Sequence, residues 1–370
     1  ISFSGDGDSQ ALGTFSWWMK RTELGRSQSN VWFEQSGYGG IQFRSDKLAV
    51  NSFDSSNTQV IVQTDAVFRD SSSWYHFMVR VNGTAGTIQF YINGVEQAQT
   101  VTNGSLASSR SWDFLSHDSR RDFYLFSNSN GSNGTSALFA EFHFLDGLSY
   151  DPSYFGETKD GVWIPKAYSG SHGTNGFYLP FDDSSAIGDD ESANTNDWTV
   201  ANLAATDVVL DSPTNNFAIF NPLDVSGSVT SFFEGNLKVE RSGNFAQAYS
   251  SFYFDSGKWY AEYLIDTGNA DPGVIAGTTN AGANRYLGQD TFTYGMYRDG
   301  RKINSGSYTS YGSSYSVAAD GSGDVVGIYI DADNGNIYFS INGTVQNSGT
   351  AAFTGVTGPF RFAADTENGG

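Results

Sequence analysis

An all-β protein built from two antiparallel β-sandwiches is the fold that this sequence predicts. Glycine accounts for 43 of the 370 residues and aromatic side chains for 15%, and hardly any stretch has the periodicity of an amphipathic helix. Segments 87–97 and 335–346 each alternate hydrophobic with polar residues and then carry Asn-Gly. This alternation places one face of a strand in a core, and Asn-Gly supplies the positive φ angles of a tight hairpin turn. The recurrence of one hairpin early and late in the chain predicts two related sandwiches.

Composition and charge exclude several classes of function. The chain has no cysteine, so it can form neither disulfides nor thiolate metal sites. Its 40 acidic and 20 basic residues give a formal charge of −20, which repels nucleic acid and anionic membrane surfaces. No run of about 18 apolar residues is present in the sequence. We therefore expect neither nucleic-acid binding nor membrane insertion.

Three regions follow one another along the chain. Turn residues divide residues 1–165 into short strand-like runs, which predict the first sandwich. Residues 166–222 are acidic and rich in Gly, Ser and Asn, but apolar anchors recur among them. We therefore predict an ordered, irregular connector that packs on both sandwiches, rather than a disordered linker. Residues 223–370 return to strand-like alternation and predict the second sandwich. The apolar anchors of the connector are Trp198, Leu203, Phe217 and Phe220.

Two sets of motifs resemble known domain families. "SSWYHFMVRVNG" followed by "GTIQFYINGVEQ" resembles the central hairpin of concanavalin A-like, laminin-G-type domains. "GKWYAEYLID" and "GDVVGIYIDADNGNIYFSINGTVQ" resemble a SPRY domain. The resemblances imply two concanavalin A-like sandwiches of the jelly-roll type, and SPRY domains bind partners through loops without catalytic machinery. Because the chain stops at "AADTENGG", we expect the final SPRY strand to be missing, disordered or supplied by another chain.

The order of the segments carries a further resemblance. The laminin-G-like region, "GVWIPKAYSG", "SPTNNFAIFNPL" and the SPRY-like region follow one another as in proteins of tailed bacteriophages, particularly those of marine and cyanobacterial hosts. Such proteins are in the main virion surface or tail-fibre proteins. The resemblance implies an extracellular location on the virion surface, with other virion proteins or copies of the same chain as partners.

Paired carboxylates are the first test for an enzyme, because retaining glycoside hydrolysis needs two of them about 5 Å apart. The nearest candidates are Glu141 with Asp146 and Glu262 with Asp266. In a regular strand, Glu141 and Asp146 would point to opposite faces, and Asp266 opens a loop. We therefore predict no catalytic residue.

Metal sites are weakly indicated. The histidines lack the spacing of a zinc site, and we predict that His76 and His143 pack or form hydrogen bonds within strands. Segment 331–336 resembles the start of an EF-hand loop but lacks its closing glutamate, so we interpret it as a turn. Calcium is the one cofactor left open, because hard cations favour clustered carboxylates. The weak calcium candidates are Asp182, Asp183, Asp189 and Asp190.

Segment 296–316 is the candidate for ligand binding. It combines tyrosine and arginine with serine and glycine, as antibody binding loops do, and aromatic faces also stack on sugar rings. An ordinary hairpin whose tyrosines pack at the edge of the sandwich is an equal alternative. The candidate residues are Tyr297, Arg298, Arg301, Tyr308, Tyr311 and Tyr315.

Together these features predict a non-enzymatic virion surface or tail-fibre protein. It would recognise a host-surface carbohydrate or protein, or make assembly contacts, and many copies on one particle would multiply weak contacts. A secreted cellular adhesin or extracellular filament subunit with the same domains is the alternative. A polysaccharide-degrading enzyme is a less favoured third hypothesis.

Overall fold

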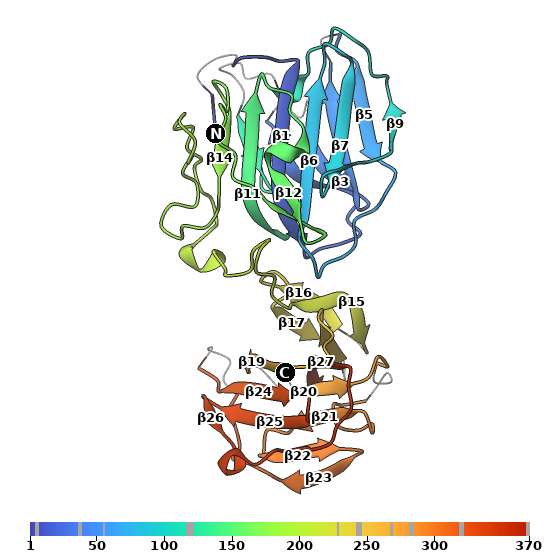
Figure 1. The fold of residues 1–370 in the computed structure, drawn as a ribbon, viewed down its shortest axis with the longest axis vertical. Helices are drawn as coiled ribbons and strands as arrows, with labels where there is room; N and C mark the ends of the chain where they lie inside the picture. The colour runs from blue at the N-terminus through green and yellow to red at the C-terminus, as the bar shows by residue number, and fades with distance from the viewer. Residues whose placement is uncertain are drawn as a thin grey trace. The chain divides into compact units, whose positions relative to one another are not determined.

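The chain folds into antiparallel β-structure, and the predicted all-β class is confirmed (Figure 1). The computed structural model describes residues 1–3, 7–35, 39–54, 56–115, 122–227, 229–241, 246–266, 269–280, 285–317 and 322–367. Within these ranges the helical elements are four 3-10 turns of three residues, none of which could cross a membrane. The chain divides into two compact units, Ile1–Phe217 and Ala218–Gly370.

The first unit contains two six-stranded sheets (Figure 1). One sheet has the strand order β14 (Phe177–Leu179), β11 (Ala137–Asp146), β1 (Leu12–Arg21), β6 (Tyr75–Asn82), β7 (Thr87–Ile92) and β8 (Val95–Glu96). The other has the order β10 (Phe123–Leu125), β2 (Ser29–Glu34), β3 (Gly39–Arg44), β4 (Lys47–Phe53), β5 (Gln59–Thr64) and β9 (Gln99–Asn103). Strands β12 (Gly156–Lys159) and β13 (Val162–Pro165) form a separate ribbon.

Aromatic side chains fill the core of this unit. Along β1, Phe15 and Trp17 lie two residues apart on the inner face and are fully buried. Trp32 of β2 meets Phe15 from the opposite sheet, with ring centroids 5.0 Å apart. The turn after β7 has φ angles of 49° at Asn93 and 79° at Gly94, so the predicted Asn-Gly hairpin is confirmed.

His76 of β6 is buried and neutral. Trp163 donates its Nε1–H to His76 Nδ1 at 3.0 Å, which leaves the ring proton on Nε2, 2.8 Å from Ser16 Oγ. Burial lowers the pKa of His76 from 6.5 to about 3. His76 is therefore a hydrogen-bonded packing residue, as the sequence predicts.

We expect His76 to make the first unit sensitive to acid. Between pH 6.5 and about pH 3 the unfolded chain binds a proton at His76 that the folded unit does not bind. The free energy of unfolding should therefore fall by about 1.4 kcal/mol per pH unit below pH 6.5 from this residue alone. Urea unfolding at a series of pH values, for the wild type and His76→Gln, measures the difference. The variant should lose stability less steeply, and equal slopes would contradict the prediction.

Residues 166–217 fall within the first unit. Strand β14 pairs with β11, and Trp198 packs on Phe177 with ring centroids 5.1 Å apart. Two other predicted anchors are largely exposed, Leu203 at 49% and Phe217 at 43%. Packing of a separate connector on both sandwiches stays a prediction.

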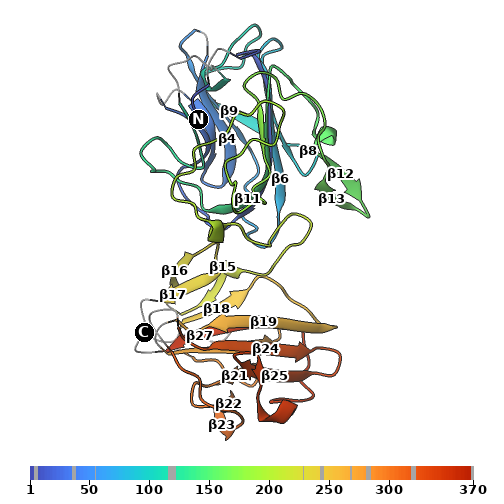
Figure 2. The same ribbon diagram turned by 90° about the vertical axis from the view of Figure 1, so that its left-hand side faces the viewer.

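The second unit contains a seven-stranded and a four-stranded sheet (Figure 2). The larger sheet has the order β15 (Phe220–Ser226), β18 (Ala246–Ser250), β27 (Phe360–Glu367), β20 (Asn269–Ala276), β21 (Thr293–Met296), β22 (Arg301–Asn304) and β23 (Ser307–Ser310). The smaller sheet has the order β19 (Lys258–Leu264), β24 (Val325–Asp331), β25 (Asn336–Ile341) and β26 (Thr344–Val345). Strands β16 (Val229–Phe233) and β17 (Lys238–Arg241) form a ribbon.

The turns of the second unit follow the sequence pattern. The 342–343 turn has φ angles of 48° and 76°, like its counterpart in the first unit. Segment 331–336 is the predicted turn, in which Asp331 Oδ1 accepts the Asn334 N–H at 3.2 Å and Gly335 has a φ of 65°. Strand β27 pairs with β18 on one side and β20 on the other. Supply of a further strand by another chain stays a prediction.

Candidate binding surface

The predicted binding segment forms the last two hairpins of the seven-stranded sheet. Between β21 and β22 the chain turns at Gly300, whose φ is 87° and whose N–H donates to the Tyr297 carbonyl at 2.9 Å. A substituent at Gly300 would lie 2.4 Å from the Gly312 carbonyl, so only glycine fits there. Between β22 and β23, Ser305 and Gly306 have φ angles of 53° and 70°. Both turns therefore have defined conformations.

Strand alternation sorts the side chains of β22 onto two faces. Lys302 faces the core, where its Nζ lies 5.2 Å from the Phe353 ring centroid and donates to the Ala352 carbonyl. Arg301 is adjacent to Lys302 and so faces outward. Tyr308 of β23 pairs with Ile303, two residues from Arg301, and shares its face. The register thus brings Arg301 and Tyr308 together on the outer face.

Four residues form what we call the Arg301 cluster: Tyr297, Asp299, Arg301 and Tyr308. The Arg301 guanidinium lies 4.3 Å from the Tyr308 ring centroid and 5.7 Å from that of Tyr297, and the two rings are edge-on at 5.5 Å. Asp299 Oδ2 accepts the Arg301 Nε–H at 2.7 Å, and this bond lowers the pKa of Asp299. The Arg301 side chain is still 42% exposed, so the guanidinium is held in place at the surface.

This arrangement suits a polyhydroxylated ligand. Tyrosine rings offer flat apolar faces to the C–H groups of a sugar, and the guanidinium and carboxylate of the Arg301 cluster offer donors and acceptors to hydroxyl groups. Because Asp299 and two rings already hold Arg301, binding would cost little side-chain entropy. Arg298 is exposed in the same turn and adds positive charge.

Two predicted ligand-binding tyrosines lie elsewhere. Tyr311 and Tyr315 are only 7% and 5% exposed and belong to the core. The Tyr311 hydroxyl donates to the Thr350 carbonyl at 2.9 Å, and the Tyr315 hydroxyl lies 2.9 Å from Asp271 Oδ1. The structure therefore corrects the expectation for these two residues, because a buried ring cannot stack on a ligand. They match the edge-packing alternative that the sequence left open.

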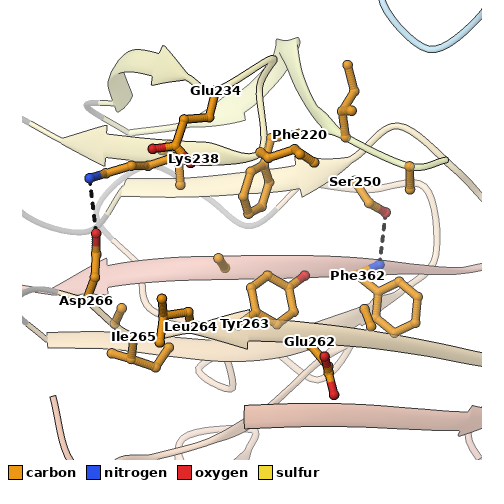
Figure 3. A pocket seen from close by; sticks show the side chains of 17 residues that line it. Phe220, Glu234, Lys238, Ser250, Glu262, Tyr263, Leu264, Ile265, Asp266 and Phe362 are labelled. Carbon is orange, nitrogen blue, oxygen red and sulfur yellow. Dashed lines mark hydrogen bonds and ion pairs between the residues drawn. The ribbon is translucent and has the colours of Figure 1, made fainter. Parts of the chain in front are cut away.

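A hollow of about 390 Å³ also lies in the second unit, between edge strand β19 and strands β15 and β18 (Figure 3). The rings of Phe220 and Tyr263 approach each other there, with centroids 6.1 Å apart. At one end Lys238 Nζ pairs with Asp266 Oδ2 at 3.0 Å. The sequence does not reveal this hollow, because its walls come from strands that are far apart in the chain.

All four carboxylates considered for catalysis have structural partners. Asp146 is fully buried and accepts backbone N–H bonds from residues 8, 9 and 175. Glu262 accepts a hydrogen bond from the Tyr260 hydroxyl, and Asp266 pairs with Lys238. The fourth, Glu141, accepts the Tyr178 hydroxyl at 2.7 Å and lies at a β-bulge. The sequence predicts a regular strand here, and no glycine marks the irregularity.

The calcium candidates show no cation site. Across the described residues, no three or more His, Asp or Glu side chains gather so that they could hold a metal ion. Asp190 is buried and accepts the backbone N–H groups of Tyr178 and Asn196, both at 2.8 Å. Asp183 accepts the Ser185 N–H at 2.8 Å. Asp183 and Asp190 thus stabilise loops, and calcium binding at Asp182, Asp183, Asp189 and Asp190 gains no support.

Two family models match separate parts of the chain. Residues 4–147 match the concanavalin A-like lectin/glucanases superfamily, and residues 258–364 match the SPRY domain. The candidate residues 297–315 lie within the SPRY match. No curated protein matches the sequence.

Several solved structures are similar to parts of the chain. A human SPRY domain is 18% identical, with 35% of this chain and 81% of that chain covered and a TM-score of 0.28. The TRIM65 PSpry domain is 14% identical, with 41% of this chain and 88% of that chain covered and a TM-score of 0.33. A candidate carbohydrate-binding protein from Bacteroides ovatus is 13% identical, with 43% of this chain and 50% of that chain covered and a TM-score of 0.29. The two family matches support the predicted order of a concanavalin A-like region followed by a SPRY region.

Proposed function

We propose that this chain is a non-enzymatic recognition protein that binds host-surface carbohydrate through the Arg301 cluster. The observation that carries the proposal is the fixed stacking of an exposed guanidinium on Tyr308 and Tyr297. A sugar ring would lie against the exposed tyrosine surface, while Arg301 and Asp299 would bond its hydroxyl groups.

The proposed setting is the surface or tail fibre of a virion, with other virion proteins or copies of the chain as partners. The order of the sequence segments supports this setting through its resemblance to tailed-phage proteins. A small surface such as the Arg301 cluster binds weakly by itself, but many copies on one particle raise the avidity by about 10²–10⁴. A rigid β-scaffold with contacts at strand ends suits such repeated display.

A glycan array tests the proposal. The purified chain, clustered on a multivalent carrier, should bind a defined subset of glycans, and Arg301→Ala should lose that binding. Lys258→Ala, an exposed cation on β19 outside the cluster, is the matched control and should bind as the wild type does. Binding to no glycan, or equal binding by Arg301→Ala, would contradict the proposal.

Removal of metal ions should leave glycan binding unchanged. The Arg301 cluster contains one carboxylate, and that carboxylate is already bonded to Arg301. A calcium-dependent sugar site would need several oxygen ligands around one cation. The same array in EDTA and in added calcium measures the effect, and a loss of binding in EDTA would place the sugar site elsewhere.

A further inference from the structure

The first unit holds a second hollow, of about 600 Å³, beside strand β11. Its walls come from β11 and from segments 180–187 and 203–214, and are mostly apolar. Leu203 and Leu210 on its border are 49% and 81% exposed, so the hollow is open to solvent. Its volume is in the range of small-molecule sites.

Three residues that line this hollow have backbone conformations that are unfavourable for residues with side chains. Phe126, Glu141 and Phe181 have φ angles of 64°, 53° and 61°. Glycine occupies this region easily, whereas bulky residues rarely adopt it. Strained residues of this kind concentrate at ligand sites, where they direct a side chain toward its partner.

The strain at Glu141 has a visible cause. Ser16 pairs with His143 and Trp18 with Ala140, so β11 has two residues opposite the single residue between Ser16 and Trp18. This β-bulge turns Glu141 out of the regular alternation of the strand, as bulges do beside functional sites. The Glu141 carboxylate accepts the Tyr178 hydroxyl at 2.7 Å and contributes to the wall of the hollow.

Glu141 has no cationic partner in the part of the chain that the structure describes. Burial raises its pKa, the Asp182 carboxylate adds to that rise, and the bond from Tyr178 opposes it. Asp182, Asp207 and Asp211 also line the hollow, and among the described residues no lysine or arginine does. Of these carboxylates, Asp211 is neutralised by Lys20, whose Nζ lies 2.7 Å from Asp211 Oδ2. A cation in the hollow would therefore relieve an unbalanced negative charge.

Aromatic rings complete the wall. Phe126 stacks on Phe139 with ring centroids 3.7 Å apart, and the centroids of the Phe126 and Phe181 rings are 5.8 Å apart. Aromatic faces attract organic cations, and the attraction grows where water is excluded. The hollow thus combines apolar contact, ring faces and a carboxylate.

We propose that the hollow beside β11 binds an organic ammonium ion that carries an apolar group, with Glu141 as its counter-ion. This site lies in the first unit and is independent of the Arg301 cluster. The apolar group would contact the phenylalanine rings, and the ammonium group would donate to the Glu141 carboxylate in a charge-assisted hydrogen bond.

Calorimetric titration with three small probes that share a phenyl ring but differ in charge tests whether binding requires a cation. Benzylammonium should bind at least about tenfold more tightly than benzyl alcohol, and benzoate should not bind, because only the first probe complements a carboxylate. Equal affinities for benzylammonium and benzyl alcohol, or no binding of benzylammonium, would overturn the proposal.

Two variants at Glu141 separate binding from folding. Glu141→Gln keeps the size of the side chain and should lower benzylammonium affinity at least about tenfold. Glu141→Gly should abolish the preference for the cation and still fold, because glycine accepts the φ of 53° and relief of this strain offsets the lost bond from Tyr178. Asp160→Asn, an exposed acid in the turn between β12 and β13 and outside the hollow, is the control and should bind benzylammonium normally. Unchanged benzylammonium affinity in Glu141→Gln would show a purely structural glutamate and overturn the proposal.

Discussion

Replacement of Asp211 by alanine is expected to lower the free energy of unfolding of the first unit by about 3–5 kcal/mol. The Lys20 side chain is 0% exposed, and its Nζ lies 2.7 Å from Asp211 Oδ2. Burial lowers the pKa of Lys20, and the bond to Asp211 opposes that shift. Without the carboxylate, a buried ammonium group would lose its counter-charge. Asp211 also accepts the Trp74 Nε1–H at 2.8 Å, so a second buried donor would lose its partner.

Removal of the Lys20 charge as well distinguishes the cost of an unpaired buried ammonium group from a simple loss of packing. The double variant Lys20→Met with Asp211→Ala removes both charges and should recover most of the lost stability. Asp189→Ala, an exposed acid in the same acidic segment, should change stability by less than about 0.5 kcal/mol. Urea unfolding measures all three variants. A loss below about 1 kcal/mol for Asp211→Ala, or no recovery in the double variant, would contradict the view that this ion pair holds the segment in place.

Replacement of Tyr315 by alanine is expected to destabilise the second unit by about 3–5 kcal/mol. The ring is 5% exposed within the core, and burial raises the pKa of its hydroxyl. That hydroxyl lies 2.9 Å from Asp271 Oδ1, so Tyr315→Phe should cost about 1–2 kcal/mol by leaving a buried carboxylate short of a donor.

Tyr308→Ala is the matched comparison for Tyr315→Ala. Tyr308 packs against Arg301 on the outer face, so its removal should cost less than about 1 kcal/mol. Chemical denaturation followed by tryptophan fluorescence measures these variants. Equal losses from Tyr308→Ala and Tyr315→Ala would contradict the assignment of one tyrosine to the surface and the other to the core. Binding studies should therefore replace Tyr297 and Tyr308, because loss of Tyr311 or Tyr315 would disturb the fold.

Local features of the sequence were sufficient to predict the sandwiches. Alternation at period two and an Asn-Gly turn are properties of neighbouring residues, and both recur in the structure at 93–94 and 342–343. The face of the sheet on which each tyrosine side chain lies could not be predicted in this way. A shift of one residue in strand pairing reverses every side chain, so the place of Tyr308 beside Arg301 depends on the pairing of Tyr308 with Ile303.

Contacts between distant segments account for the features that the sequence did not reveal. Lys20 and Asp211 are 191 residues apart in the chain, and neither residue type indicates a partner. The bulge at Glu141 follows from the way β11 meets β1, and a glutamate with a φ of 53° leaves no sign in the sequence. The two hollows likewise form only where separate segments meet.

The affinity of the chain for the best glycan found on the array is the measurement that tests the central claim most directly. Calorimetry should compare the wild type with Tyr308→Ala and with Tyr338→Ala, a half-buried tyrosine of β25 outside the Arg301 cluster. If the cluster is the binding surface, Tyr308→Ala should weaken binding at least about tenfold, in line with the loss of an aromatic anchor, and Tyr338→Ala should leave it unchanged. Undiminished affinity in Tyr308→Ala would contradict the account and remove the Arg301 cluster as the recognition site.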